Sequence, residues 1–96
     1  MAITFDPAKR DHTLAERGLD FADAEQVFDG PLVENPDERF DYGEQRLMTV
    51  GYLDERMVVM VWTPRGNDRH IISMRKANDR EQEKYREQLG GSGRRS

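Results

Sequence analysis

The order of apolar and polar residues predicts helices in the first third of the chain. A first helix is expected over residues 7–17, because Asp6 is a good N-cap and Pro7 suits the first helical position. Gly18 stands where a glycine commonly ends a helix. Leu14 is the strongly apolar residue of this segment, so we expect a surface helix anchored by Leu14.

A second, shorter helix is expected directly afterwards. Asp20 is its predicted N-cap, and Gly30-Pro31 stops it because proline cannot continue a helix. Its apolar residues recur every three or four positions, namely at Phe21, Ala24, Val27 and Phe28. This spacing gives one apolar helical face, which predicts packing against a core.

Beyond this helix the pattern is typical of strands. Residues 32–41 are polar and contain a proline, so they predict a weak strand or an extended loop. Stronger strands are expected at residues 45–52, 57–62 and 70–74, with turns at 53–56 and 63–68 between them. The continuous apolar run at 57–62 favours a central strand covered on both faces. Three strands joined by short turns predict an antiparallel meander. A further short strand is expected at residues 3–5, which alternate in polarity.

A last helix is expected to run to about residue 89, capped by Asn78 or Asp79. A chain of 96 residues has room for one small core. We therefore expect a single α+β domain over residues 1–89, with N-terminal helices packed on the antiparallel meander and a C-terminal helix. Residues 90–96 are rich in glycine and serine and predict a flexible tail.

Composition excludes several kinds of site. The chain has no cysteine, which excludes disulfides, thiolate metal sites and a cysteine nucleophile. His12 and His70 have no acidic residues at metal-ligand spacing, so neither a metal nor another cofactor is expected. The N-terminus lacks the apolar run of a signal peptide, and the longest apolar stretch is far shorter than the ~20 residues of a membrane helix. We expect a soluble, cytoplasmic protein.

The net charge of −4 is unevenly distributed. Residues 20–44 contain nine acidic residues and one basic residue, whereas residues 45–96 contain seven acidic and eleven basic residues. A positive C-terminal half suits an anionic ligand, and the acidic segment either repels that ligand or binds a basic partner. Two solvent-exposed faces of opposite charge, without any ligand or partner, would give the same distribution of charged residues.

Candidate chemistry is densest in residues 65–76. If residues 69–75 alternate as a regular strand with Ile72 and Met74 in the core, then Arg69, Ser73 and Arg75 share an open face. Arginine suits phosphate binding because its charge is permanent and its planar fork matches phosphate oxygens.

Glu44 and Arg46 are expected to share a face at the start of the meander. A carboxylate beside guanidinium groups is a candidate general base. Cross-strand ion pairing on an exposed sheet face would explain the same residues without any function.

In order along the chain, these residues resemble the BrnT toxins, which are ribonuclease toxins of type II toxin–antitoxin modules. The C-terminal matches are Ile71-Ile72-Ser73-Met74-Arg75-Lys76-Ala77, Glu81 and Tyr85. The earlier matches are Phe5-Asp6, Lys9, Gly18, Phe21, Ala24, Val27-Phe28, Pro31, Glu44, Arg46 and Gly51. The resemblance covers about residues 3–88. The chain departs from the family in having Phe5 for a frequent Trp, Thr13 for Asn, and Glu16-Arg17 for Lys-His.

The resemblance implies a fold similar to the RelE toxins and a metal-independent endoribonuclease that inhibits translation and growth in its bacterial host. It also implies a DNA-binding antitoxin of the ribbon-helix-helix or a similar type, in a complex that represses its own operon. Carried over to this chain, the catalytic residues are Glu44, Arg46, Arg75, Lys9 and Tyr85. The expected RNA-binding residues are Arg65, Arg69, Ser73 and Lys76.

In the implied reaction, the 2′-OH of the RNA attacks the neighbouring phosphate, with Glu44 as the first choice of base and Lys9 as the second. Tyr85 or Lys76 protonates the leaving oxygen, and the arginines stabilise the charge on phosphate. The residues alone leave two alternatives to a ribonuclease. One is a non-catalytic module whose acidic segment docks a basic partner. The other is a nucleic-acid binder without catalysis.

Overall fold

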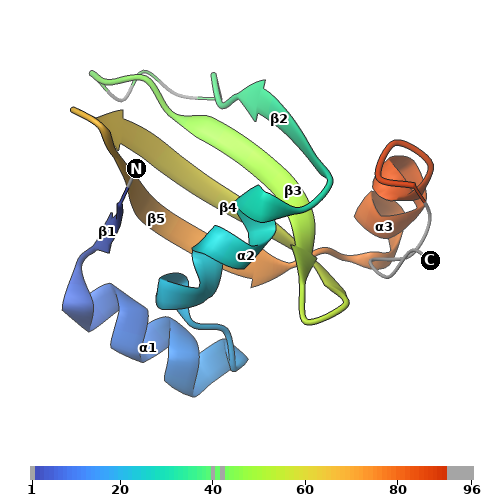
Figure 1. Cartoon of the computed structure of the whole chain (residues 1–96), viewed down its shortest axis with the longest axis horizontal. Coiled ribbons are helices and arrows are strands. Elements are labelled where there is room, and N and C mark those ends of the chain that lie inside the picture. The colour runs from blue at the N-terminus through green and yellow to red at the C-terminus, as the bar shows by residue number, and fades with distance from the viewer. Residues whose placement is uncertain (1, 40, 42, 91–96) are drawn as a thin grey trace.

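The computed structural model describes residues 2–39, 41 and 43–90, and forms one five-stranded sheet with helices around it (Figure 1). The elements in chain order are β1 (Ile3–Phe5), α1 (Pro7–Arg17), the 3-10 turn η1 (Phe21–Asp23), α2 (Ala24–Asp29), β2 (Leu32–Pro36), β3 (Leu47–Leu53), β4 (Arg56–Arg65), β5 (Asp68–Lys76) and α3 (Asp79–Arg86). The predicted α+β class is confirmed. Of the predicted flexible tail, residues 91–96 lie outside the described residues, and Gly90 belongs to a turn after α3.

The sheet has the strand order β1-β5-β4-β3-β2. The predicted antiparallel meander of β3, β4 and β5 is confirmed, and β2 extends it as a further antiparallel strand. In contrast, β1 pairs with β5 in parallel, so the sheet is mixed. The predicted turn at residues 63–68 is too long, since β4 continues to Arg65 and β5 begins at Asp68. Gly66, with φ of 60°, supplies the left-handed conformation that this tight turn needs.

Strand β5 contains a β-bulge at Ile72. Val61 of β4 lies opposite Ser73, whereas the next residue, Trp62, lies opposite Ile71. The extra residue shifts the alternation of side chains by one position. As a result Ile71 and Met74 are both fully buried in the same core, although they are three residues apart. The expectation that Ile72 and Met74 share the core face is therefore wrong.

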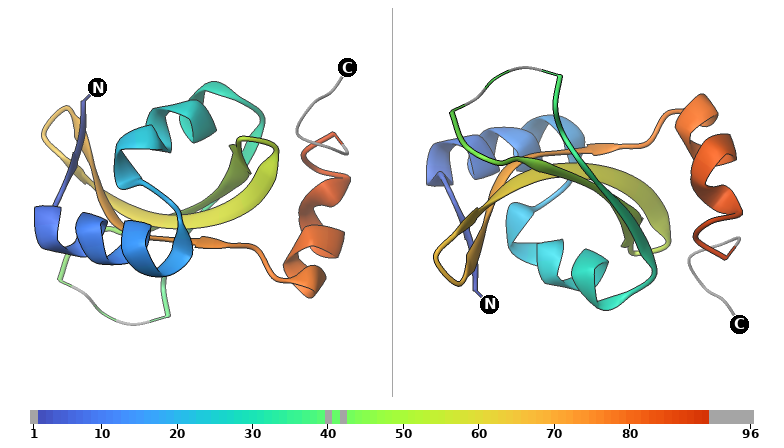
Figure 2. Two further views of the ribbon diagram at one scale, coloured as in Figure 1. Left: turned by 90° about the horizontal axis from the view of Figure 1, so that it is seen from below. Right: turned by 90° about the horizontal axis from the view of Figure 1, so that it is seen from above.

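The larger core lies between the sheet and the N-terminal helices. Figure 2 shows α2 across one side of the sheet and α1 along the β5 edge. The buried residues of this core are Leu19, Phe21, Ala24, Val27, Leu53, Val58, Met60, Trp62, Ile71 and Met74. Gly51 is needed here because α2 packs so closely that a Cβ at this position would lie 2.8 Å from Val27 Cγ1.

The caps of α1 are as predicted: the Asp6 side chain accepts a hydrogen bond from the Ala8 N–H, and Gly18 is left-handed with φ of 69°. The anchor of α1 is not the predicted one. Leu14 is 39% exposed, and the buried residue of the helix is Thr13. An ion pair between Arg10 and Asp20 also holds α1 to η1, with Nε and Oδ1 2.8 Å apart.

A second, smaller core lies on the opposite side of the sheet, under α3. Its buried residues are Val50, Met57, Val59, Ala77, Tyr85 and Leu89. Helix α3 begins with a capping box, in which Asn78 accepts from the Glu81 N–H and Glu81 accepts from the Asn78 N–H. The packing of Tyr85 and Leu89 on Val59 and its neighbours places α3 over one end of this sheet face, and polar residues occupy the other end.

Candidate functional site

Polar side chains from three segments gather on the side of the sheet opposite α2. The alternation of β4 and the bulged β5 directs Thr63, Arg65, His70, Ser73 and Arg75 to this side. Glu44 and Arg46, which precede β3, join them through ion pairs. We call these seven residues the polar face. In Figure 2, the described part of the chain between β2 and β3 lies on this side of the sheet.

Glu44 links two arginines of the polar face. Its Oε2 lies 3.3 Å from Arg46 Nε, and its Oε1 lies 3.8 Å from Arg65 Nη2. The Glu44 side chain is 32% exposed and that of Arg46 is 25% exposed, so solvent reaches this group. The two residues were expected on the first strand of the meander, but β3 begins only at Leu47. Their predicted proximity is nevertheless confirmed.

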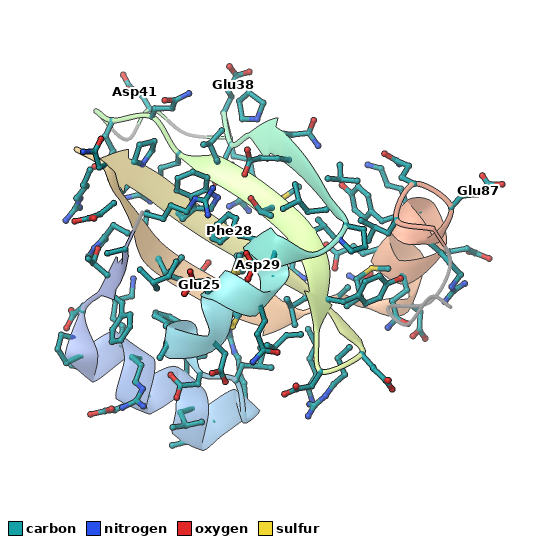
Figure 3. The ribbon with its side chains drawn as sticks, in the orientation of Figure 1. Glu25, Phe28, Asp29, Glu38, Asp41 and Glu87 are labelled. Atoms are coloured by element: carbon teal, nitrogen blue, oxygen red, sulfur yellow. The ribbon has the colours of Figure 1, made fainter. Side chains whose placement is uncertain are left out.

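The segment before Glu44 is fixed at its base. The Asp37 N–H donates to the Arg46 carbonyl at 2.8 Å, and the buried Asp37 carboxylate accepts from Arg39 Nε at 2.8 Å. An open cleft of about 430 Å³ is lined by Pro36, Asp37, Glu38, Asp41, Glu44, Gln45 and Arg46. Figure 3 shows Glu38 and Asp41 pointing away from the sheet. The cleft therefore combines an acidic outer rim with the Glu44–Arg46 pair at the polar face.

Arg75 is held by the first turn of α3. Its Nη1 and Nη2 donate to the two carboxylate oxygens of Glu81, each at 2.8 Å. This bidentate contact raises the pKa of Arg75 and lowers the pKa of Glu81 to about 2, because each charge stabilises the other. Arg75 is still 43% exposed, so its guanidinium is oriented yet open to solvent.

The edge of β5 beside Arg75 is covered by the end of α1. Arg17 Nη1 donates to the Met74 carbonyl at 2.9 Å, where β1 no longer pairs with β5. A cleft of about 360 Å³ at this edge is lined by Glu16, Arg17, Arg75 and Lys76. Arg17, which departs from the frequent family residue, thus satisfies a strand carbonyl close to Arg75.

His70 belongs to the polar face, although sequence reasoning considered it only as a metal ligand. Its Nδ1 lies 2.9 Å from Thr4 Oγ1, a contact made possible by the pairing of β1 with β5. Burial and the positive charges of Arg65 and Lys9 lower the pKa of His70, outweighing the opposite effect of Glu44 and Asp6. No signal in the sequence indicated this position, because the bulge and the β1 pairing both depend on the folded chain.

Arg69 lies on the other side of the sheet, so the expectation that it shares a face with Ser73 and Arg75 is wrong. The bulge at Ile72 reverses its direction relative to both residues. Its guanidinium carbon lies 3.9 Å from the centre of the Phe28 ring and 5.6 Å from that of Trp62. Figure 3 shows Phe28 on α2, on this side of the sheet. Arg69 Nε is buried and has no hydrogen-bond partner among the described residues.

The other expected site residues lie outside the polar face. Lys9 is exposed on α1, and its positive charge contributes to the lowered pKa of His70. Lys76 is exposed at the end of β5, beside Arg75. Tyr85 is buried under α3, with Lys84 Nζ 5.1 Å from the centre of its ring.

The described residues contain neither a metal-binding cluster nor a membrane-spanning helix. Within residues 2–39, 41 and 43–90, no three His, Cys, Asp or Glu side chains are grouped so that they would hold a metal ion. In the same part of the chain, no helix has the length and apolar character required to span a membrane.

Comparison with known proteins identifies one family. The family of the ribonuclease toxin BrnT of type II toxin–antitoxin systems matches residues 5–81, which include all seven residues of the polar face. A search of the curated proteins found no match. The family match covers most of the chain, from β1 to the first turn of α3, and the chain therefore belongs to the BrnT family of ribonuclease toxins.

Proposed function

We propose that this toxin cleaves RNA at the polar face, without a metal ion, by attack of a 2′-OH on the neighbouring phosphate. The reaction gives a 2′,3′-cyclic phosphate and a free 5′-OH, and only RNA carries the internal nucleophile. The observation that supports the proposal is the grouping of Arg46, Arg65 and Arg75 with Glu44 and His70 on one face.

The arginines suit the charge that develops during this reaction. The attacked phosphate gains negative charge on its non-bridging oxygens, and guanidinium groups aimed at these oxygens stabilise it. Arg75 is oriented by Glu81, and Arg46 is oriented by Glu44. Since each arginine is already held before RNA binds, little conformational freedom is lost when the phosphate arrives.

Glu44 is better suited to holding the arginines than to accepting a proton. Both of its oxygens lie close to guanidinium groups, at 3.3 Å and 3.8 Å. Its first role in the proposal is therefore to position Arg46 and Arg65. Neither expected proton donor for the leaving oxygen lies on the polar face. Tyr85 is buried under α3, and Lys76 pairs with Val58, whose side chain lies in the core on the α2 side. We therefore propose that the leaving oxygen takes its proton from water.

The test is cleavage of an end-labelled, mixed-sequence single-stranded RNA by the purified chain, with and without EDTA. We expect equal cleavage in both, a cyclic phosphate at the new 3′ end, and no cleavage of DNA of the same sequence. Loss of cleavage in EDTA would overturn the metal-free mechanism. Cleavage of the DNA would overturn attack by the 2′-OH.

The family also implies an antitoxin protein as partner. We propose that this antitoxin is a DNA-binding protein of the ribbon-helix-helix or a similar type, acting with the toxin in the cytoplasm. Induced expression of the chain alone should arrest growth, and expression of the neighbouring gene should relieve the arrest. If the cells grow normally while the chain accumulates in a stable and soluble form, the alternative of a non-catalytic binding module is favoured. In that alternative, the acidic rim around Glu38 and Asp41 is the docking site for a basic partner.

A further inference from the structure

His70 is held in one orientation on the polar face. It lies on β5 between Thr4 of β1 and Thr63 of β4, and both neighbours are its direct strand partners. The Thr63 hydroxyl donates a hydrogen bond to the Gln45 carbonyl at 2.6 Å, whereas Thr4 Oγ1 lies 2.9 Å from His70 Nδ1. One ring nitrogen of His70 is therefore fixed by the sheet.

The contact with Thr4 can select the tautomer of His70. When Nδ1–H donates to Thr4 Oγ1, the lone pair of a neutral imidazole is on Nε2. In catalytic histidines that act as general bases, one ring nitrogen donates a hydrogen bond that orients the ring, and the other nitrogen accepts the proton. Nδ1 and Nε2 of His70 would have these two roles.

Burial, together with the surrounding charges, favours the neutral form of His70. Positive charge reaches the ring from Arg65 on β4 and from Lys9 on α1, and negative charge from Glu44 before β3 and Asp6 before α1. Partial burial of the ring is the main reason that the pKa of His70 falls below its ordinary value, and the two cations add to this effect. At neutral pH the ring is therefore ready to accept a proton.

The position of His70 relative to the arginines fits a reacting phosphate. Arg65 is bound to Glu44, which also binds Arg46, and the charges of Glu44 and Arg65 both act on His70. Ser73 and Arg75 follow His70 along the same face of β5. A phosphate bound by Arg65 would therefore lie within the electrostatic reach of the imidazole.

We propose that His70 is the general base of RNA cleavage, a role that rests on the proposed function. Its Nε2 takes the proton of the 2′-OH while the bond from O2′ to phosphorus forms and the bond from phosphorus to O5′ breaks. The 5′-oxygen leaves with a proton from a water molecule, which becomes hydroxide. His70 then returns its proton to the hydroxide, which restores the neutral imidazole and the water molecule.

The first experiment compares His70→Gln with His12→Gln. His12 is the other histidine of the chain and is exposed on α1, so it is the matched control. We expect His70→Gln to lower kcat/KM for the end-labelled RNA by about 10²–10⁴-fold, the usual contribution of a general base. His12→Gln should cleave like the unaltered chain. Circular dichroism and thermal unfolding report whether both variants are folded.

The pH profile separates a base from a structural residue. For the unaltered chain, kcat/KM should rise with pH and level off above a midpoint lower than about 6.5, the ordinary pKa of histidine. His70→Gln should lack this rise. Thr4→Val, which has the same shape without the hydroxyl, should lower activity less than His70→Gln and shift the midpoint. A folded His70→Gln variant with unchanged rate and profile overturns the assignment while leaving the ribonuclease proposal intact.

A binding experiment keeps the two proposals distinct. NMR titration of the imidazole signals with 2′-O-methyl RNA, which cannot be cleaved, should shift the His70 signals and leave those of His12 in place. If the RNA binds and the His70 signals do not move, His70 is not at the scissile site. If the unaltered chain cleaves no RNA at any pH, the proposed function fails, and the role of His70 as a base fails with it.

Discussion

The two sides of the sheet differ in what covers them, and Arg69 and Arg75 illustrate the difference. On the α2 side, the core is apolar and continuous, and Arg69 lies against Phe28 and Trp62. On the opposite side, α3 covers only one end, and Arg75 is bound to Glu81 at the border of the polar face. Two arginines six residues apart on one strand thus have different surroundings. We infer that one side mainly stabilises the fold and the other performs the chemistry.

The largest expected effect is on stability and concerns the α2 side. Phe21→Ala removes a fully buried ring that packs edge-on against Phe5. We expect a loss of about 3–5 kcal/mol in the free energy of unfolding, measured by urea denaturation, because the cavity is not refilled. Leu14→Ala on the exposed side of α1 is the control and should cost far less. Equal losses would contradict the assignment of the core.

The next effect concerns catalysis on the polar face. Arg75→Ala should lower the rate of RNA cleavage by about 10²–10³-fold, the typical cost of removing one donor aimed at the reacting group. Arg75→Lys should restore only part of the rate, because lysine cannot form two parallel hydrogen bonds. Arg56→Ala, at the remote turn between β3 and β4, should cleave normally. A normal rate in Arg75→Ala would move the site elsewhere.

A smaller effect concerns the Arg75–Glu81 pair and depends on pH. The folded state lowers the pKa of Glu81 to about 2, from an ordinary value of 4.5, so the pair stabilises the fold at pH values above 4.5. This stabilisation is lost as the pH falls from 4.5 toward 2. Because Glu81 is partly exposed, we expect Glu81→Gln to cost about 1 kcal/mol at neutral pH.

The pH dependence is checked by unfolding at a series of pH values. The difference in stability between Glu81→Gln and the unaltered chain should shrink as the solution becomes acidic. Glu83→Gln, an exposed neighbour on the same helix, should show no such trend. A constant difference across the acidic range would mean that the loss comes from the helix cap rather than from the ion pair.

The smallest effect tests Arg69 directly. Arg69→Ala removes a cation stacked on Phe28, which should cost about 0.5–1 kcal/mol of stability. Cleavage should be unchanged, because the residue lies on the other side of the sheet from Arg75. If Arg69→Ala lowered cleavage as much as Arg75→Ala, RNA would bind on the α2 side. The inference that only the opposite side performs the chemistry would then be wrong.

Local sequence determined most of the elements. Asp6-Pro7 and Gly18 set the ends of α1, and Asn78 with Glu81 sets the start of α3, because each signal acts within one helical turn. The continuous apolar run of β4 determined the central strand, and the proximity of Glu44 and Arg46 follows from their separation by one residue.

Tertiary structure alone decided how the strands present the site. The parallel pairing of β1 with β5 joins Thr4 to His70, which are 66 residues apart, and no local pattern encodes that contact. The bulge at Ile72 likewise depends on the register between β4 and β5, and it reverses Arg69 relative to Arg75. The side on which a strand residue lies is set by partners distant in sequence. Glu44, Arg46, Arg65, Ser73 and Arg75 of the polar face could therefore be named from the sequence. The presence of His70 and Thr63 beside them could not, because it depends on the register of the folded sheet.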